Sequence, residues 1–147
     1  MKSTIYKTCV LTVGLGFLAI NSFAQNSKPN EYYARLTGEA YTLGSVFPVD
    51  DIESITVTNY NGTHKLTPKE LSFLKEQLKK AKYAGGLLVK PGHITMGMQL
   101  KTKSAAKSGY VYPTKGSIHF DGAVNKLGKQ FSGTYWLPLA INFDDYK

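Results

Sequence analysis

One short segment of the chain carries the residue types of a catalytic site. Ser117, His119 and Asp121 alternate with apolar residues, so on a β-strand their three side chains share one face. Side chains two apart on a strand have Cα atoms roughly 6.5–7 Å apart. A serine nucleophile needs its base within about 2.6–3.2 Å, and no G-x-S-x-G motif accompanies these residues. The pattern therefore argues against a Ser-His-Asp hydrolase.

The same segment offers ligands for a metal ion. His119 and Asp121 could chelate from one strand face, with His93 or His64 as a third ligand and water completing an open site. An H-x-D pair is a weak signal, because it is also typical of a polar pair on a solvated sheet face. The sequence leaves a metal-assisted hydrolase that uses His93, His119 and Asp121 as the alternative function. No cofactor is expected.

Tyrosine and tryptophan side chains outside the core are the second group of candidates. A predicted strand over 130–137 places Trp136 and Thr134 on one face and core residues on the other. Tyr110 and Tyr112 lie in another predicted strand. Tyr and Trp outside a core often mark contact surfaces for a partner. Trp136, Thr134, Tyr110 and Tyr112 are therefore the candidate binding residues.

The same aromatic side chains also allow a structural interpretation. The segment that precedes the clearest elements carries Tyr32 and Tyr33. These rings could cover the face that holds Trp136. The sequence leaves open whether that face receives a partner or is covered by the chain itself.

The N-terminus has the three parts of an export signal. Lys2 and Lys7 are positive, residues 9–20 are apolar, and Ser22-Phe23-Ala24 is a small-x-small cleavage motif. The apolar run is shorter than the roughly 20 residues that span a bilayer. We expect residues 1–24 to be a cleaved signal peptide of bacterial type. The released protein is then expected in the periplasm or the extracellular medium, with no transmembrane anchor.

Composition limits what the exported chain can do. Removing residues 1–24 leaves 123 residues, the size of one domain, without the only cysteine, Cys9. Disulfides and thiol catalysis are therefore not expected. Sixteen basic residues then remain against 10 acidic ones, and only Arg35 is an arginine. Because recognition of phosphates and bases relies on arginine, nucleic acid is not an expected partner, and the lysines favour only a weak attraction to anionic surfaces.

The first elements of the domain have local sequence signals. Polar residues 25–31 predict a flexible tether, and the globular domain is expected over 32–147, with its best-defined part at 52–143. β-Branched residues predict a strand over 52–60. Asn61-Gly62 then predicts a two-residue turn that pairs Tyr60 with Thr63.

A helix and a run of strands are predicted to follow the hairpin. Thr67-Pro68-Lys69-Glu70 carries a cap, a proline at the first helical position and a capping box, and Gly85-Gly86 is expected to end the helix. Alternating or β-rich runs predict strands over 94–100, 110–112, 117–121, 130–137 and 139–143. The expected fold class is α+β, with an N-terminal β-hairpin and one amphipathic helix packed on one face of a single antiparallel sheet.

Together these features favour a non-catalytic binding module over an enzyme. The predicted fold is well specified, aromatic side chains are abundant, and no set of catalytic residues converges in the sequence. We expect an exported module that contacts a protein or glycan partner through a sheet face or a loop.

Overall fold

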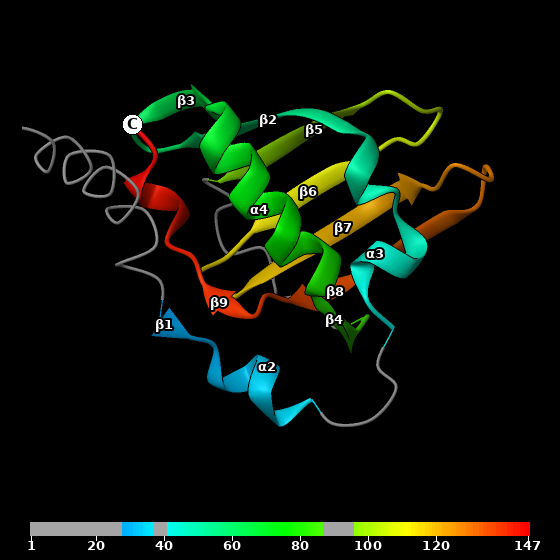
Figure 1. The fold of residues 1–147 in the computed structure, drawn as a ribbon, viewed down its shortest axis with the longest axis horizontal. Coiled ribbons are helices and arrows are strands. Elements are labelled where there is room, and N and C mark those ends of the chain that lie inside the picture. Colours follow the sequence, from blue (N-terminus) through cyan, green and yellow to red (C-terminus); the bar gives the residue numbers. More distant parts are fainter. Residues whose placement is uncertain (1–27, 37–40, 87–95) are drawn as a thin grey trace, which may run out of the picture.

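The computed structural model describes residues 28–36, 41–86 and 96–147 (Figure 1). Its helical segments are α2 (Glu31–Arg35), α3 (Leu43–Val46), η1 (Val49–Asp51), α4 (Pro68–Lys80) and η2 (Phe143–Asp145). Its strands are β1 (Lys28–Pro29), β2 (Ile52–Asn59), β3 (Gly62–Lys65), β4 (Lys82–Gly85), β5 (Gly97–Thr102), β6 (Tyr110–Pro113), β7 (Ser117–Val124), β8 (Gln130–Trp136) and β9 (Leu139–Ala140). The expected signal peptide and the candidate ligand His93 lie outside the described residues.

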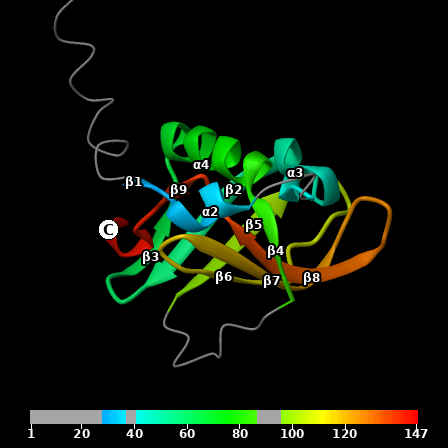
Figure 2. The same ribbon diagram turned by 90° about the horizontal axis from the view of Figure 1, so that it is seen from below.

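Seven antiparallel strands form the main sheet, in the order β3-β2-β5-β6-β7-β8-β4. β1 and β9 pair in a second, two-stranded sheet, so the single sheet expected from the sequence has a small companion. α4 and α3 lie on one face of the main sheet (Figure 1, Figure 2). The α+β class, with one long helix on an antiparallel sheet, is confirmed.

The core lies between α4 and the main sheet. Leu74 and Leu78 of α4 are fully buried, as the helical spacing of apolar residues predicts. An aromatic cluster continues the core under α3, where the ring of Phe47 lies 5.8 Å from that of Phe120 and 6.0 Å from that of Phe131. Phe120 and Phe131 belong to β7 and β8, so the helix layer and these strands share one apolar interior.

The start of α4 follows its sequence signals closely. The Thr67 side chain accepts a hydrogen bond from the backbone N–H of Glu70, and the Glu70 carboxylate accepts one from the backbone N–H of Thr67. Pro68 occupies the first helical position. The predicted capping box is confirmed, because it depends only on residues three apart in the chain.

The end of α4 differs from the prediction. The helix stops at Lys80, and Lys82–Gly85 forms β4 at an edge of the main sheet, where Lys82 pairs with Trp136 of β8. The expected stop at Gly85-Gly86 was wrong by about one helical turn. Pairing with β8 favours an extended backbone over a further turn of helix, and no local pattern reveals that pairing.

The hairpin between β2 and β3 forms with another register than the one predicted. Asn59 pairs with Gly62, so Tyr60 and Asn61 are the turn residues, and the expected pairing of Tyr60 with Thr63 was wrong. The Asn59 side-chain oxygen accepts the backbone N–H of Asn61 at 2.8 Å and thereby closes the turn early.

The N-terminal segment is attached to the body of the fold within residues 28–31, the part of the expected 25–31 tether that the structure describes. Asn30 is buried, and its side-chain Nδ2 donates to the carbonyl oxygens of Gly116 and Leu137, both at 2.7 Å. Its backbone N–H donates to Pro138 at 3.0 Å. One residue with two side-chain anchors and one backbone anchor outweighs the polar composition around it.

Candidate functional site

The candidate binding residues lie on the face of the main sheet opposite the core. Their neighbours Val111, Phe120 and Tyr135 are buried in the core, and side chains alternate along each strand. The register places Tyr112 beside His119 and His119 beside Thr134. We call the set Tyr110, Tyr112, His119, Thr134 and Trp136 the aromatic face.

Three rings of the aromatic face form a row with nearly parallel planes. The Tyr110 and Tyr112 rings are 6.5 Å apart at 8°, and the Tyr112 and His119 rings are 6.3 Å apart at 21°. The ring of His119 is fixed in turn, because its Nδ1 hydrogen-bonds with the Thr134 hydroxyl at 2.9 Å. Tyr110 is 71% exposed, so the row ends in solvent.

Trp136 continues this face along β8 but is covered by another ring. Tyr32 of α2 stacks on it with a centroid distance of 4.7 Å and an angle of 17°. Such an aromatic pair contributes about 0.5–1.5 kcal/mol beyond its buried area. The sequence left open whether this face is covered by the chain or exposed. At one end of the aromatic face the chain covers Trp136, whereas at the other end Tyr110 is exposed.

The structure does not assemble the Ser-His-Asp set. The Ser117 hydroxyl hydrogen-bonds with that of Thr114 at 2.8 Å, and His119 hydrogen-bonds with Thr134. Asp121 is exposed beside Tyr110 in the register of β6 and β7. The three side chains do alternate on one face as predicted, but no described contact joins them into a proton relay.

A metal centre has no support from the described residues. Among residues 28–36, 41–86 and 96–147, no three His, Cys, Asp or Glu side chains form a group that could hold a metal ion. His64 lies on β3, which β2, β5 and β6 separate from the strand that holds His119 and Asp121. His93 lies outside the described residues, so the set of His93, His119 and Asp121 stays a prediction.

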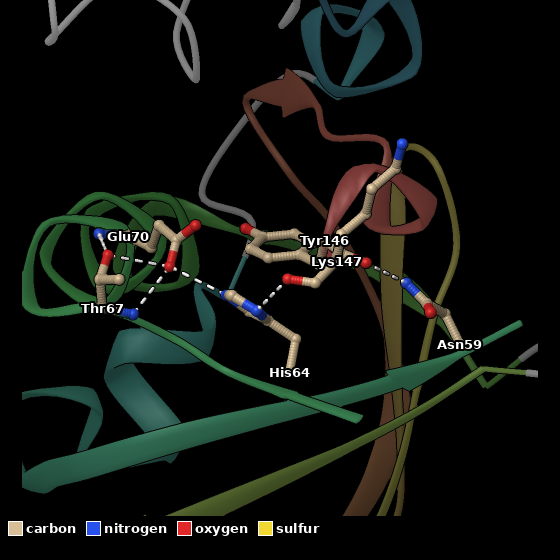
Figure 3. Close-up of polar contacts among 6 residues, drawn as sticks. All are labelled: Asn59, His64, Thr67, Glu70, Tyr146 and Lys147. Carbon is tan, nitrogen blue, oxygen red and sulfur yellow. Dashed lines mark hydrogen bonds and ion pairs between the residues drawn. The ribbon is translucent and has the colours of Figure 1, made fainter. Parts of the chain in front are cut away.

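His64 belongs instead to a polar cluster that ties residue 147 to the start of α4 (Figure 3). Its Nε2 lies 3.2 Å from the Glu70 carboxylate and its Nδ1 lies 2.8 Å from the main-chain oxygen of Lys147. Both partners only accept hydrogen bonds, so a protonated ring satisfies both and a neutral ring satisfies one. Because Glu70 also caps α4 through Thr67, the cluster has a structural role.

The electrostatics of this cluster predict a loss of stability in acid. Burial acts to raise the pKa of Glu70, but hydrogen bonds from the Thr67 backbone, the His64 ring and the Thr67 hydroxyl bring it below its usual 4.5. A carboxylate with a lowered pKa contributes its full stabilisation above its unfolded-state pKa, and this contribution is lost as the pH falls through the folded-state pKa. Glu70→Gln keeps a capping side chain that cannot titrate. Its urea midpoint should therefore fall less between pH 6 and pH 3 than that of the wild type.

A matched carboxylate on the same helix provides the control for this prediction. Glu76 is exposed on α4, where its carboxylate pairs with Lys79 at 3.3 Å. Glu76→Gln should keep the acid dependence of the wild type. Equal acid dependence of the wild type and the Glu70→Gln variant would show that Glu70 is not the source of the effect.

Lysines of α4 are used partly within the fold. The Lys75 Nζ donates to the backbone oxygens of Asp50 at 2.7 Å and Ile52 at 3.1 Å, and the Lys79 Nζ lies 2.6 Å from the Asp50 carboxylate. These two cations hold η1 and the start of β2 against the helix.

The sequence pattern predicts Tyr110, Tyr112, Thr134 and Trp136 as binding residues, but it does not predict the contacts that organise them. His119, a candidate metal ligand only in the alternative function, lies in the ring row, and Tyr32 was considered only as a cover for Trp136. No helix in the described part of the chain is long and apolar enough to cross a membrane. The chain matches no protein-family model, no curated protein and no solved structure.

Proposed function

We propose that the protein is an exported, non-catalytic module that binds a glycan through the aromatic face. The observation that carries this proposal is the row of Tyr110, Tyr112 and His119, whose rings have nearly parallel planes and which ends at the exposed Tyr110. Export is supported by the leader pattern of residues 1–24.

The chemistry of the row suits a sugar. A pyranose ring has apolar C–H surfaces that pack on aromatic rings and hydroxyl groups that need hydrogen-bond partners. The tyrosines offer both an apolar body and a polar tip. The Nε2 of His119 has no hydrogen-bond partner among the described residues, while Nδ1 is held by Thr134. A sugar hydroxyl can therefore approach a ring nitrogen whose orientation is already fixed.

The exposed side chains favour a glycan over a protein partner. Among the described residues, the large apolar side chains that are exposed are five tyrosines and a single aliphatic residue, Leu127. Interfaces between proteins concentrate their energy in well-packed, fully desolvated pockets. Tyrosine is common in such centres, but of the exposed tyrosines only Tyr110 belongs to the aromatic face. Amphipathic rings without an aliphatic patch are better matched to a hydroxyl-rich ligand.

Titration with soluble oligosaccharides tests the proposal. The probes are cellohexaose and chitohexaose, and binding is followed by NMR shifts of the isotope-labelled protein. We expect shifts concentrated at the aromatic face. Tyr110→Ala and Tyr112→Ala should each weaken binding about tenfold, the loss expected when one stacking contact near 1.4 kcal/mol disappears.

Tyr60→Ala is the matched control. Tyr60 is 76% exposed, close to Tyr110 in exposure, but it lies at the turn between β2 and β3, near the opposite edge of the sheet from β4. Its removal should leave the affinity unchanged. Failure of both sugars to bind, or equal affinity in all three variants, would overturn the proposed function.

A further inference from the structure

The stacking surface of Trp136 is occupied by a part of the chain that contributes nothing to the core. α2 is a helix of five residues, none of them buried. Tyr32, which stacks on Trp136, is itself 60% exposed. A helix this short is not stable in isolation. Its position therefore depends on its contacts with the main sheet.

Those contacts pass through two adjacent side chains of the sheet. Lys82 pairs with Trp136 in the register of β4 and β8. The Lys82 Nζ lies 4.7 Å from the centroid of the Tyr33 ring and donates to the backbone oxygen of Leu36 at 3.0 Å. Trp136 thus contacts α2 through Tyr32, and Lys82 contacts it through Tyr33 and the C-cap residue Leu36.

The segment that carries α2 is fixed on both sides. Before it, Asn30 is anchored to Gly116 and Leu137. After it, the backbone oxygen of Tyr41 accepts the N–H of Tyr83 at 2.7 Å, and Thr42 forms a bridge with Lys82. Release of α2 from Trp136 would leave these anchors and the buried core intact. Segments with few buried contacts are the ones that open locally at low free energy.

We propose that residues 31–36 form a displaceable strap, in which the Tyr32 ring occupies the position that a sugar ring takes on Trp136. The choice of ligand rests on the proposed function, whereas the strap itself rests on the contacts described above. Binding along the whole aromatic face then requires the strap to leave. The apparent affinity of the wild type for the sugar equals the affinity of the open form multiplied by the fraction of molecules in which the strap is open. Freeing Trp136 raises that fraction and restores the affinity.

The first test needs no ligand, because Trp136 is the only tryptophan of the chain. Quenching of its fluorescence by acrylamide should be about twofold stronger in Tyr32→Ala than in the wild type, as expected for a ring released from a stack. Tyr60→Ala should match the wild type. In the wild type, urea should expose Trp136 to the quencher before the global transition seen by far-UV circular dichroism. Exposure only at the global transition would overturn the strap.

The second test measures the coupling to the ligand. Tyr32→Ala should bind cellohexaose or chitohexaose about threefold or more tightly than the wild type, and adding Trp136→Ala should abolish this gain. Unchanged or weaker binding by Tyr32→Ala would overturn the strap even if Tyr110 and Tyr112 prove necessary for binding. If no variant binds either sugar, the proposed function fails, and the quenching experiment alone decides on the strap.

Discussion

Gly109→Ala should lower the free energy of unfolding by about 3 kcal/mol or more, the sum expected for a left-handed alanine and an overpacked contact. Gly109 has a φ of +62°, and a Cβ at this position would overlap the carbonyl oxygen of Asp121. It would also lie 2.7 Å from the carbonyl carbon of Gly122 and 2.8 Å from the nitrogen of Ala123. These are backbone atoms at an irregularity of β7, where the register with β8 shifts between Phe120 and Ala123. The backbone of residues 121–123 has little freedom to move away from the added Cβ.

Gly122→Ala is the matched control for this prediction. Gly122 has nearly the same φ, +65°, but a Cβ there has no neighbour within 4 Å. It should therefore cost only the conformational penalty of about 1–2 kcal/mol. Urea unfolding of the two variants separates strain from overlap. Equal losses would show that the irregular part of β7 moves to accommodate the added atom.

The elements that sequence analysis predicted well are those specified by residues close together in the chain. Thr67, Pro68 and Glu70 define the start of α4 within four positions, and the capping box forms as expected. Alternation from Ser117 to Asp121 also predicts that Ile118 and Phe120 face the core, and both are fully buried. In both cases the physical cause is local backbone geometry, which the spacing of residues in the sequence reproduces directly.

The errors concern contacts between residues far apart in the chain. The register of the first hairpin depends on Asn59, whose Nδ2 donates to the backbone oxygens of Phe143 and Tyr146, both at 2.9 Å and more than 80 positions away. β4 was taken for the end of a helix because its partner strand, β8, follows about 50 residues later. Asn residues in polar surroundings usually indicate turns, so nothing local distinguishes an asparagine that anchors a distant segment.

The same limit applies to the candidate site. Alternation identified Tyr110, Tyr112, Thr134 and Trp136 as residues on one face of their strands. It could not show that His119 lies between Tyr112 and Thr134, because this depends on the order of β6, β7 and β8 in the sheet. The strap depends on a contact between residues more than 100 positions apart, Tyr32 and Trp136. The chemistry of the site could be proposed from residue types, whereas its organisation required the fold.

Asn30→Asp should lower the free energy of unfolding by about 2–4 kcal/mol, the loss of two buried hydrogen bonds plus the cost of an unpaired buried charge. The Asn30 Nδ2 donates to two carbonyl oxygens, of Gly116 and Leu137. Its Oδ1 accepts the backbone N–H groups of Tyr32 and Tyr33. The substitution keeps the accepting end that caps α2 and replaces the donating end with an oxygen that faces two further oxygens. Urea unfolding at pH 7 measures the loss.

Asn61→Asp tests whether burial and the double contact are the cause. The Asn61 Nδ2 donates to a single carbonyl oxygen, that of Asp144, at an exposed position. Its substitution should cost less than about 1 kcal/mol, as is usual at the surface. In Asn30→Asp, the deficit relative to the wild type should shrink in acid, since a protonated carboxyl can donate to one of the two carbonyls again. A deficit that is independent of pH, or equal to that of Asn61→Asp, would show that the contacts to Gly116 and Leu137 do not hold the N-terminal segment.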